Sequence, residues 1–494
     1  MEPAEVKPPI PPMVEETCIG PAAPSSFRDP SGFVLAWENR IYRLVNQDGA
    51  VDLEAFLGSE PATRFLDEGR VVSSRRMRDS EARDFLSRIT GPLPFEAAEV
   101  LEHERIQFPS FPYEWPPEML HAAGTLTLDL AKETLNAGLG LKDATPQNVL
   151  FRGPAPVFVD VLSFEKRNPL KRAWLPYAQF VRTFLLPLAA NRYFGLSLAD
   201  MLLKRRDGME PAEVYRMCGP LRRLFPPFLS LVTLPTWLAG RGEGSAQAET
   251  GEARSAEEAR FVLNGLFDSL RRTLDRLSPR TGRDSVWAGY LDSKSLYSPE
   301  QLAIKEQFVR QAVEGIRPEA VLDIGANEGY FSAICARSGA RVVAIDSDPV
   351  VAGFLWRKAR AEKLNILPLV VDLARPTPAA GWRNLECASF LDRARGNFDM
   401  VLMLAVLHHL LVTERIPLAD ALDLAAELTR KYLLIEYVGT TDPMFRRITR
   451  GRGTLHAAFT KEAFEAALSV RFDLLRSVPL GGLDRCLYLA RKKA

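Results

Sequence analysis

The sequence predicts a doubly wound α/β domain in the C-terminal half of the chain and a separate α+β domain before it. From Ala320 onward, short apolar stretches of strand length alternate with helical patterns, and strands separated by helices form a parallel sheet. Residues 239–256 are rich in glycine, alanine and glutamate and have no hydrophobic period, which predicts a flexible linker between the two halves.

The composition excludes several classes of protein. The chain has 494 residues, and 47% of them are hydrophobic, so it can bury more than one core. Its 63 basic and 62 acidic residues leave a net charge of +1, so we expect no nucleic-acid partner. The five cysteines form no CxxC pair, which indicates neither a disulfide scaffold nor a zinc site and favours a cytoplasmic location. The longest uncharged run, Leu224–Gly240, is interrupted by three prolines, and we interpret it as a buried or interfacial segment rather than a transmembrane span.

These patterns divide the chain into four segments. Residues 1–30 hold eight prolines and are predicted to be a disordered tail. Residues 31–238 form the first predicted domain, and the linker at 239–256 separates it from the second domain at 257–494. A long amphipathic helix over residues 257–278 opens that second domain.

The first domain is predicted to mix short strands with helices. GFVLAWE at 32–38 and IYRLV at 41–45 read as a hairpin, followed by a turn at Gln47–Gly49. Another strand is predicted at 104–111, and the helical rhythm after it, over 118–140, stops at Gly138. The remaining predicted elements are two short strands at 148–151 and 156–161 and a proline-interrupted helical region at 174–238.

The second domain is predicted to contain five buried strands joined by helices, with one further helix and two strands at its end. The five strands are VLDIG at 321–325, RVVAID at 341–346, LPLVV at 367–371, FDMVLML at 398–404 and KYLLIEYV at 431–438. The closing elements are a helix at 460–468 and strands at 471–477 and 485–490.

Acidic residues stand at or beside the ends of the first three of these strands. Asp323 precedes a turn that contains Gly325 and Gly329 and leads into a helix, whose free N–H groups can bind an anion. Asp346 ends the next strand, about 20 residues on, where a carboxylate can accept both ribose hydroxyls. Asp372 follows the third strand. Three acidic strand ends at one edge predict a nucleoside-binding site, although each aspartate alone could merely cap a strand or helix.

The order of these motifs resembles that of class I S-adenosylmethionine (SAM)-dependent methyltransferases, which have a Rossmann-like sheet. The resemblance covers about residues 290–494, including the two closing strands. It implies that SAM is the cofactor, with its aminoacyl end at Asp323, Gly325, Asn327 and Gly329, its ribose at Asp346 and its adenine at Asp372, and with Leu404 lining the site. Asn327 stands where many members have glycine. The rival dinucleotide-binding motif GxGxxG would need glycines at Asn327 and Tyr330.

The sequence after the fourth strand, LAVLHH, bears on the methyl acceptor. It lacks the (Asn/Asp)-Pro-Pro-aromatic motif that amino-directed members of this family often carry, which argues against methylation of a nucleic-acid base or amide. The balanced charge and the lack of a base-stacking platform favour a small-molecule or glycan hydroxyl as acceptor. A hydroxyl must lose a proton, and His408 or His409 could be the base. The alternative is that the two histidines line the site or cap the following helix. No metal is expected in this half.

Two other groups of residues near this edge could contribute to binding. Tyr290 and Tyr297 could form an aromatic lid over the cofactor, or they could be ordinary packing residues. Four arginines after the fifth strand could select an acidic acceptor or could simply be solvated. These are Arg446, Arg447, Arg450 and Arg452.

In the first domain, Asp143 and Asn148 stand five residues apart in LKDATPQNVLF, and Asp160 follows twelve residues later at the end of a strand. This spacing resembles the catalytic loop and the metal-binding aspartate of the protein-kinase and aminoglycoside-phosphotransferase superfamily. The resemblance implies that Asp143 is the base and that Asn148 and Asp160 bind magnesium.

The first domain also departs from the kinase pattern. No lysine occurs between Lys7 and Lys132, so the phosphate-anchoring lysine is missing, and Arg43 could replace only its charge. We therefore predict a kinase-like domain of the pseudokinase kind, which binds an acceptor, a nucleotide or a partner, with Mg-ATP as the lesser alternative. A helical domain in which Asp143 and Asn148 only close turns is a further alternative.

The whole arrangement resembles bacterial nodulation-type methyltransferases. We expect a cytoplasmic enzyme that transfers a methyl group from SAM to an unidentified small-molecule or glycan acceptor. One alternative is a bifunctional enzyme that both phosphorylates and methylates one substrate. Another is a non-catalytic scaffold, which would bind no SAM.

Overall fold

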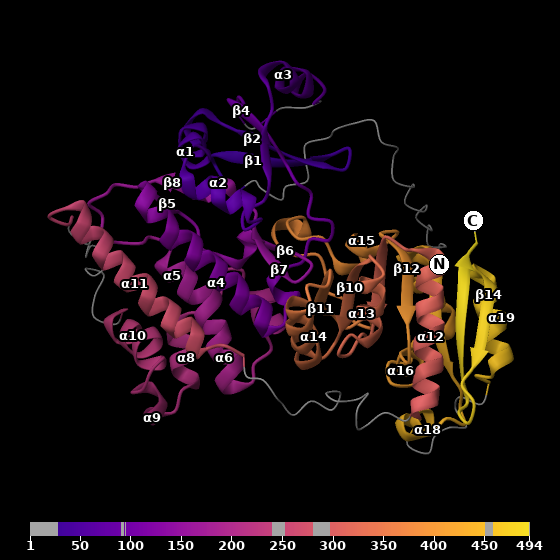
Figure 1. Ribbon diagram of the computed structural model, residues 1–494. Helices are drawn as coiled ribbons and strands as arrows, with labels where there is room; N and C mark the ends of the chain where they lie inside the picture. The colour runs from indigo at the N-terminus through magenta and orange to yellow at the C-terminus, as the bar shows by residue number, and fades with distance from the viewer. Residues whose placement is uncertain are drawn as a thin grey trace, which may run out of the picture. The chain divides into compact units, whose positions relative to one another are not determined.

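The computed structural model describes residues 28–89, 93, 95–239, 252–279, 297–449 and 458–493. Its backbone contacts divide the chain into two compact units, one made of Met1–Ala50 and Ser74–Arg105 and the other of Val51–Ser73 and Ile106–Ala494. The second unit thus contains both the helical part of the first half and the whole C-terminal α/β sheet (Figure 1). The predicted tail at 1–30 and linker at 239–256 lie largely outside the described residues.

The first unit is built on a four-stranded antiparallel sheet with the order β1-β2-β4-β3. Its strands are β1 (Gly32–Trp37), β2 (Arg40–Val45), β3 (Ser74–Arg76) and β4 (Glu99–His103), and α3 (Asp79–Ser87) belongs to the same unit. Leu35, Leu44, Val100 and Phe85 form its core. The pairing of β1 with β2 confirms the predicted hairpin.

Two local predictions in this region are wrong. The turn expected at Gln47–Gly49 is the first turn of helix α1 (Gln47–Leu57), because Asn46 Oδ1 accepts the Gly49 N–H at 2.9 Å. The strand expected at 104–111 is absent from the structure there, and the paired residues precede it in β4. Pro109 removes one of the N–H groups that this strand would need, and Pro112 follows its last residue directly, which favours the irregular path observed.

The helical part of the second unit surrounds α4 (Pro117–Thr134), which is buried along most of its length. After the short η2 (Leu135–Ala137), Gly138 adopts a φ of 72° as the C-cap, as the predicted stop requires. Strands β6 (Val149–Arg152) and β7 (Ala155–Phe158) form the predicted hairpin. The other elements of this part are α2 (Glu60–Asp67), η1 (Pro112–Glu114), β5 (Leu139–Leu141), η3 (Pro146–Asn148), η4 (Val161–Ser163), β8 (Phe164–Lys166), α5 (Tyr177–Phe180), η5 (Val181–Leu185), α6 (Leu186–Phe194), α7 (Leu198–Lys204), α8 (Pro211–Met217), α9 (Pro220–Arg223), η6 (Leu229–Thr233) and α10 (Leu234–Ala239).

Helix α11 (Ala256–Arg276) has the predicted bounds within two residues but not the predicted neighbours. The sequence assigned it to the C-terminal domain, whereas Lys132 Nζ on α4 pairs with Asp268 Oδ1 at 2.6 Å and Arg271 pairs with Asp129. Trp174 packs edge-on against Phe267. These contacts place α11 among the helices of the first half.

The C-terminal part of the second unit is a seven-stranded sheet with the order β11-β10-β9-β12-β13-β15-β14. Its strands are β9 (Ala320–Ile324), β10 (Arg341–Asp346), β11 (Ile366–Val370), β12 (Phe398–Met403), β13 (Thr429–Val438), β14 (Phe472–Pro479) and β15 (Arg485–Lys492). The first five in this order are parallel, and β15 and β14 join antiparallel. All seven predicted strands are confirmed, and the antiparallel closing pair differs from the six-stranded dinucleotide-binding order.

Helices cover this sheet, as the alternation predicted. Val309 on α12 (Pro299–Ile316), Ile334 on α13 (Tyr330–Arg337) and Leu355 on α14 (Pro349–Ala361) join one core with Val321 and Met400 of the sheet. Each such fully buried aliphatic side chain stabilises the fold by about 1.5–3 kcal/mol. The remaining elements are η7 (Trp382–Asn384), α15 (Phe390–Ala394), α16 (Leu407–Val412), α17 (Leu418–Leu428), α18 (Pro443–Thr449) and α19 (Lys461–Arg471).

Residues of the helical part contact the loops and helices of this sheet within the second unit. Glu114, fully buried at the end of η1, forms an ion pair with Arg393 on α15 and accepts a hydrogen bond from Thr377 Oγ1 at 2.5 Å. Trp356 Nε1 on α14 donates to the carbonyl of Pro154 at 3.0 Å. Among the helices in the described parts of the chain, none has both the length and the apolar composition to cross a bilayer.

Candidate cofactor and acceptor site

The loop between β9 and α13 is shaped by two glycines. Gly325 and Gly329 have φ values of 69° and 73°, which favour glycine. A Cβ on Gly325 would overlap the Val406 side chain, and one on Gly329 would overlap Leu355, so the loop also lies too close to its neighbours for larger residues. Asn327 has a φ of 51°, which asparagine tolerates better than most residues. The loop therefore exposes its backbone at the carboxyl end of β9.

Asp346, at the end of β10, holds this loop in place. Its Oδ2 accepts the N–H of Asn327 at 2.9 Å, and its Oδ1 accepts the N–H of Asp348 at 3.0 Å. Burial raises the pKa of Asp346, although these two backbone hydrogen bonds act in the opposite direction. Each carboxylate oxygen can accept a further hydrogen bond, so the side chain could also bind a diol.

Asp372 lies after β11, on the next strand of the sheet. Its Oδ1 accepts the N–H of Ala374 at 2.9 Å, and its Oδ2 pairs with Arg375 at 2.7 Å. The side chain of Asp372 is 34% exposed, and it is more open to solvent than Asp323. The parallel register of β9, β10 and β11 brings the three predicted acidic positions to one edge of the sheet.

Asp323 is buried, unlike the other two. It is 3% exposed, and its Oδ2 accepts a hydrogen bond from Ser332 Oγ on α13 at 2.5 Å. Burial raises the pKa of the Asp323 carboxyl to about 7, even though the bond from Ser332 and the charge of Lys305 favour the ionised form. The hydrogen bond between Asp323 and Ser332 thus connects β9 to the first turn of α13, the two elements that the glycine loop joins.

The loop after β12 lies against the glycine loop. Leu404 is 7% exposed, and Val406 makes the close approach to Gly325. Two residues on, His408 is 1% exposed, and neither of its ring nitrogens has a hydrogen-bond partner among the described residues. Its ring centroid lies 4.3 Å from that of His409. Val406, two residues before His408, is thus the residue by which this segment contacts the predicted cofactor loop.

Both imidazoles are neutral at neutral pH. Burial lowers the pKa of His408 well below its usual value, and the neighbouring His409 and the cations Arg485 and Lys305 lower it further. Burial, with a smaller effect of Arg485, also lowers the pKa of His409. A neutral imidazole can accept a proton, which is the state a general base needs.

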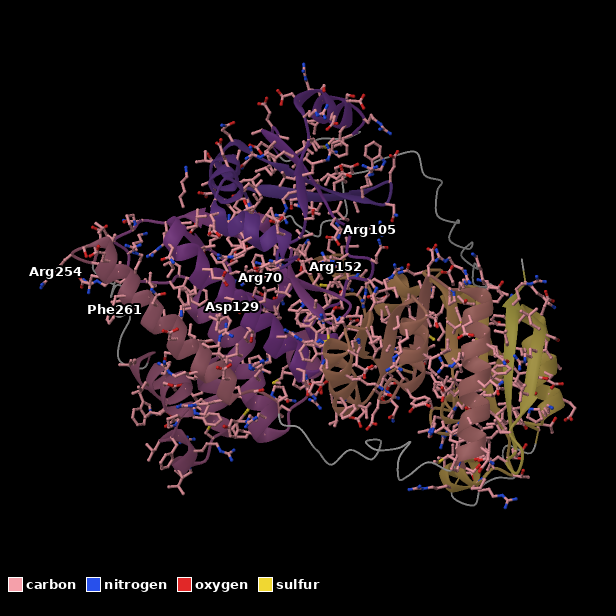
Figure 2. All side chains as sticks on the ribbon, in the orientation of Figure 1. Arg70, Arg105, Asp129, Arg152, Arg254 and Phe261 are labelled. Atoms are coloured by element: carbon pink, nitrogen blue, oxygen red, sulfur yellow. The ribbon has the colours of Figure 1, made fainter. Side chains whose placement is uncertain are left out.

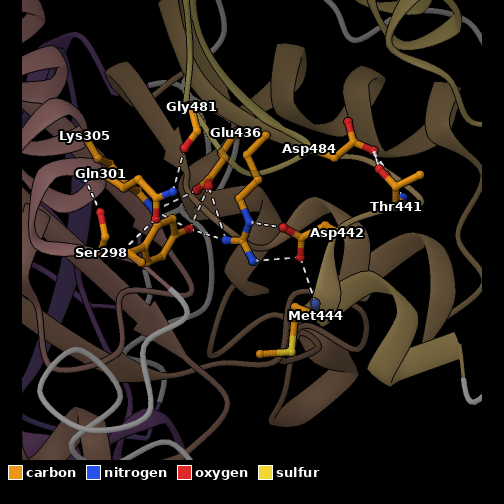
Figure 3. Close-up of polar contacts among 11 residues, drawn as sticks. Ser298, Gln301, Lys305, Glu436, Thr441, Asp442, Met444, Gly481 and Asp484 are labelled. Carbon is orange, nitrogen blue, oxygen red and sulfur yellow. Dashed lines mark hydrogen bonds and ion pairs between the residues drawn. The ribbon is translucent and has the colours of Figure 1, made fainter.

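A buried ion network lies on the β13 side of the same edge (Figure 3). Glu436 Oε2 on β13 pairs with Lys305 Nζ on α12 at 2.7 Å, and Glu436 Oε1 accepts from Tyr297 Oη at 2.6 Å. Asp442 forms two bonds with Arg485, from Nε to Oδ2 at 2.7 Å and from Nη2 to Oδ1 at 3.0 Å. Arg485 Nη1 also lies 3.4 Å from Glu436 Oε1. The negative charges of two carboxylates are thus balanced by the positive charges of two basic side chains, in a site almost without solvent.

The other residues predicted near this edge differ in their surroundings. Tyr297 does not lie open as a lid, because its hydroxyl joins the buried ion network and Arg485 stacks 4.7 Å from its ring centroid. Arg446 and Arg447 are exposed on α18. The other three predicted residues, Tyr290, Arg450 and Arg452, lie outside the described residues.

The kinase-like residues of the first half are brought together only in part. Asn148 Nδ2 donates to Ser163 Oγ at 3.1 Å, and Ser163 Oγ donates to Asp160 Oδ2 at 2.5 Å. Asp143 Oδ1 instead accepts from Gln179 Nε2 at 3.2 Å. Arg43, the predicted substitute for the missing lysine, lies in the first unit on β2, where Asp29 is 3.8 Å away.

Sequence reasoning missed the residues of the buried ion network other than Tyr297. A signal was present at one of them, because Glu436 is a single charge inside the apolar strand sequence YLLIEYV. An isolated charge in a buried strand needs a partner of opposite sign. The partner Lys305 lies 131 residues away, and no local pattern identifies it.

Comparisons with known proteins agree with this geometry. Residues 322–431 match the family model described as a methyltransferase domain. The chain is 29% identical over 465 residues to the nodulation protein NoeA of Rhizobium meliloti (strain 1021), and the alignment covers 94% of each chain. The family match begins within β9 and ends within β13, so it includes the loops that follow β9, β10, β11 and β12.

The chain is also similar to solved structures. One is the N-methyltransferase NodS from Bradyrhizobium japonicum WM9 in complex with S-adenosyl-L-homocysteine, with 17% identity, a TM-score of 0.31, and coverage of 46% of this chain and 98% of that one. Another is the bifunctional kinase-methyltransferase WbdD, with 18% identity, a TM-score of 0.29, and coverage of 41% of each chain. From the family match and the geometry of the loop after β9, the C-terminal part of this chain is a SAM-dependent methyltransferase domain.

Proposed function

We propose that the protein transfers a methyl group from SAM to a hydroxyl of a small-molecule or glycan acceptor. The observation that supports this most directly is the shared edge of the sheet, where the glycine loop, Asp346 and Asp372 lie on one side and the buried, unpartnered His408 lies on the other. A nucleoside with a charged tail fits the first side, and a group that must lose a proton fits the second.

The proposed cofactor contacts follow from the free hydrogen-bonding capacity at this edge. Asp346 would accept the two ribose hydroxyls, since its two carboxylate oxygens have more lone pairs than its backbone N–H partners use. Asp372 would accept from the exocyclic amine of adenine. The loop at Gly325, Asn327 and Gly329 would lie against the aminoacyl end. The N–H groups of these three residues already donate within the protein, so a carbonyl oxygen of the loop would accept from the amino group of the cofactor.

The residues of the chain would contribute mainly by placing the acceptor and removing its proton. When bound, SAM supplies an electrophilic methyl group that reacts by in-line displacement, so correct positioning is the largest contribution. His408 would accept the hydroxyl proton, because neither of its ring nitrogens has a hydrogen-bond partner among the described residues. The buried ion network would hold β13 and α12 rigid on the acceptor side.

For the first half we propose a kinase-like lobe that binds an acceptor, a nucleotide or a partner rather than one that transfers phosphate. The support is that Asn148 and Asp160 share Ser163, whereas Asp143 is held by Gln179. In addition, no lysine occurs between Lys7 and Lys132. If Mg-ATP raised the unfolding temperature of the full chain and Asp160→Ala abolished this shift, the bifunctional alternative would replace our proposal.

The first test is isothermal titration calorimetry of the full chain with S-adenosylhomocysteine. We expect saturable binding, and we expect Asp346→Asn to weaken it by about 10- to 100-fold, because one acceptor of two hydroxyl hydrogen bonds becomes an amide. Asp473→Asn, on the edge strand β14, is the matched control and should bind as the wild type does. Equal affinity in wild type and Asp346→Asn would refute the assigned ribose contact.

A methyl-transfer assay with labelled SAM and acceptor pools then tests the histidine. We expect His408→Asn to lower kcat by at least about 100-fold while leaving the affinity for S-adenosylhomocysteine within about twofold. If His408→Asn kept its kcat, or if kcat and cofactor affinity fell together, His408 would not be the base.

A further inference from the structure

The short helices before residue 240 carry an unusual number of exposed apolar side chains. Leu221 is 74% exposed, Phe225 63%, Leu238 56%, Leu224 54% and Trp237 48%. Helices α8, α9 and α10 all contact η6, and Trp237 Nε1 donates to Tyr215 Oη at 3.1 Å, which joins these side chains into one region. We call the surface formed by these five residues the α9–α10 surface. Soluble proteins rarely expose so many large apolar groups together unless the surface binds something.

The surface is also basic. Residues 214–239 contain three arginines, Arg216, Arg222 and Arg223, and no aspartate or glutamate. The two carboxylates just before this stretch are already paired, Glu210 with Arg182 and Glu213 with Arg205. Three positive charges among exposed leucine, phenylalanine and tryptophan side chains therefore have no acidic counterpart within their own segment.

The arginines stand among the aromatic rings rather than apart from them. The Arg222 guanidinium lies 5.4 Å from the ring centroid of Tyr193 and 5.3 Å from that of Phe194. Tyr193, Leu221, Arg222 and Phe225 line a hollow of about 590 Å³ in this surface. Arginine stems over apolar groups with an accessible charge, beside tryptophan and tyrosine, are typical of a protein surface that lies at a membrane–water interface.

Two other occupants fit less well. A second copy bound by twofold symmetry would bring three arginines of one copy against three of the other, with no carboxylate in either segment to balance them. The next residues of the chain, 240–251, read GRGEGSAQAETG and contain no apolar residue larger than alanine, so they could not cover the leucine, phenylalanine and tryptophan side chains.

We propose that the α9–α10 surface docks on the surface of a lipid bilayer that contains anionic headgroups. The apolar side chains would enter the interfacial region of the bilayer, and Arg216, Arg222 and Arg223 would contact the headgroups. Binding of this kind needs no transmembrane helix. It would hold the enzyme at a surface where an acceptor with a lipid part is concentrated, and it does not depend on the function proposed above.

The test is flotation of the full chain with vesicles of phosphatidylcholine and phosphatidylglycerol, compared with vesicles of phosphatidylcholine alone. We expect binding to the anionic vesicles that weakens with added salt. The double variant Leu221→Ser/Phe225→Ser should bind at least about tenfold more weakly, because two apolar side chains leave the interface. The double variant Arg216→Gln/Arg222→Gln should lose most of the preference for anionic vesicles.

The matched control is Phe261→Ser. Phe261 is 81% exposed on α11, outside the α9–α10 surface (Figure 2), so this variant should float as the wild type does. Circular dichroism of every variant checks that it is folded. The proposal would be overturned if the wild type did not float with anionic vesicles, or if Phe261→Ser lowered binding as much as Leu221→Ser/Phe225→Ser did. A dimer that this double variant dissolves, seen by light scattering without vesicle binding, would assign the surface to a second copy instead.

Discussion

The two sides of the carboxyl edge of the C-terminal sheet are built differently. On the β10 and β11 side, Asp346 and Asp372 are held by backbone N–H groups and by one exposed arginine, and both keep capacity to bind a ligand. On the β13 side, Glu436 and Asp442 are fully buried, and their charges are matched by Lys305 and Arg485.

This difference separates carboxylates that can bind a ligand from carboxylates that stabilise the fold. A carboxylate held by backbone groups of its own loop stays in place without using all its lone pairs, so a ligand can complete them. A carboxylate whose partners are buried cations is satisfied already, and its removal leaves those cations without compensation. We therefore expect the first side to affect ligand affinity and the second side to affect stability.

The β10–β11 side also receives support from the helical part of the second unit. Thr377 lies five residues after Asp372, and it donates to the buried Glu114, which also pairs with Arg393. The Arg393 guanidinium lies 5.1 Å from the ring centroid of Phe108. The loop that carries Asp372 is thus fixed by residues that come more than 250 positions earlier in the chain.

The largest change in the free energy of unfolding is expected from a substitution on the β13 side. Glu436→Ala should lower the free energy of unfolding by about 3–5 kcal/mol, because Lys305 and Arg485 would keep their charges in a buried site without the carboxylate. Urea denaturation of the full chain measures this loss. Glu462→Ala, in the exposed first turn of α19, is the control and should change stability little. Similar losses in both variants would remove the distinction between the two sides.

A smaller effect is expected from the contact that supports the β11 loop. Glu114→Gln keeps the shape of the side chain but leaves Arg393 without a carboxylate, and we expect a loss of about 2–3 kcal/mol in the free energy of unfolding. We also expect weaker binding of S-adenosylhomocysteine in calorimetry, because an amide oxygen accepts the hydrogen bond from Thr377, near Asp372, less strongly than a carboxylate does. Glu60→Gln, exposed on α2, is the matched control. If the folded Glu114→Gln variant bound the ligand as tightly as the wild type, the contact of Glu114 with Thr377 and Arg393 would not affect the cofactor site.

A third effect is expected in the dependence of stability on pH. The folded state raises the pKa of Asp323 to about 7, so between about pH 4 and 7 the folded protein holds a proton that the unfolded chain has lost. This group therefore contributes stability that is lost as the pH rises through that window. His408 has the opposite effect, because its lowered pKa means that stability is lost as the pH falls below about 6.5.

Without the Asp323 carboxyl, the dependence of stability on pH should therefore be set more strongly by His408. We expect the stability of Asp323→Asn to rise more steeply with pH between about 4 and 7 than that of the wild type, as measured by urea denaturation at several pH values. Asp473→Asn, exposed on β14, should give a curve parallel to that of the wild type. If the curve of Asp323→Asn also ran parallel, the Asp323 carboxyl would not have the raised pKa.

Local sequence patterns were enough to predict most of the strands of the C-terminal sheet. Apolar runs such as VLDIG and RVVAID can be buried on both faces only between helices, so both the strands and their alternation with helices were predictable. The same reasoning failed at Gln47–Gly49, where Asn46 caps a helix, because the residues that favour a turn also favour a helix start. It also placed α11 with the wrong half, since an amphipathic pattern indicates a buried face but not the element that buries it.

The sequence by itself determined that acidic residues and glycines stand at the ends of successive strands, and hence that they meet at one edge of a parallel sheet. Only the tertiary structure decided which of these carboxylates are open and which are enclosed. The reason is that enclosure depends on partners far along the chain: Glu436 meets Lys305 across 131 residues, and Glu114 meets Arg393 across 279. No local period or motif encodes such pairs, because each forms only when separately folded elements pack together.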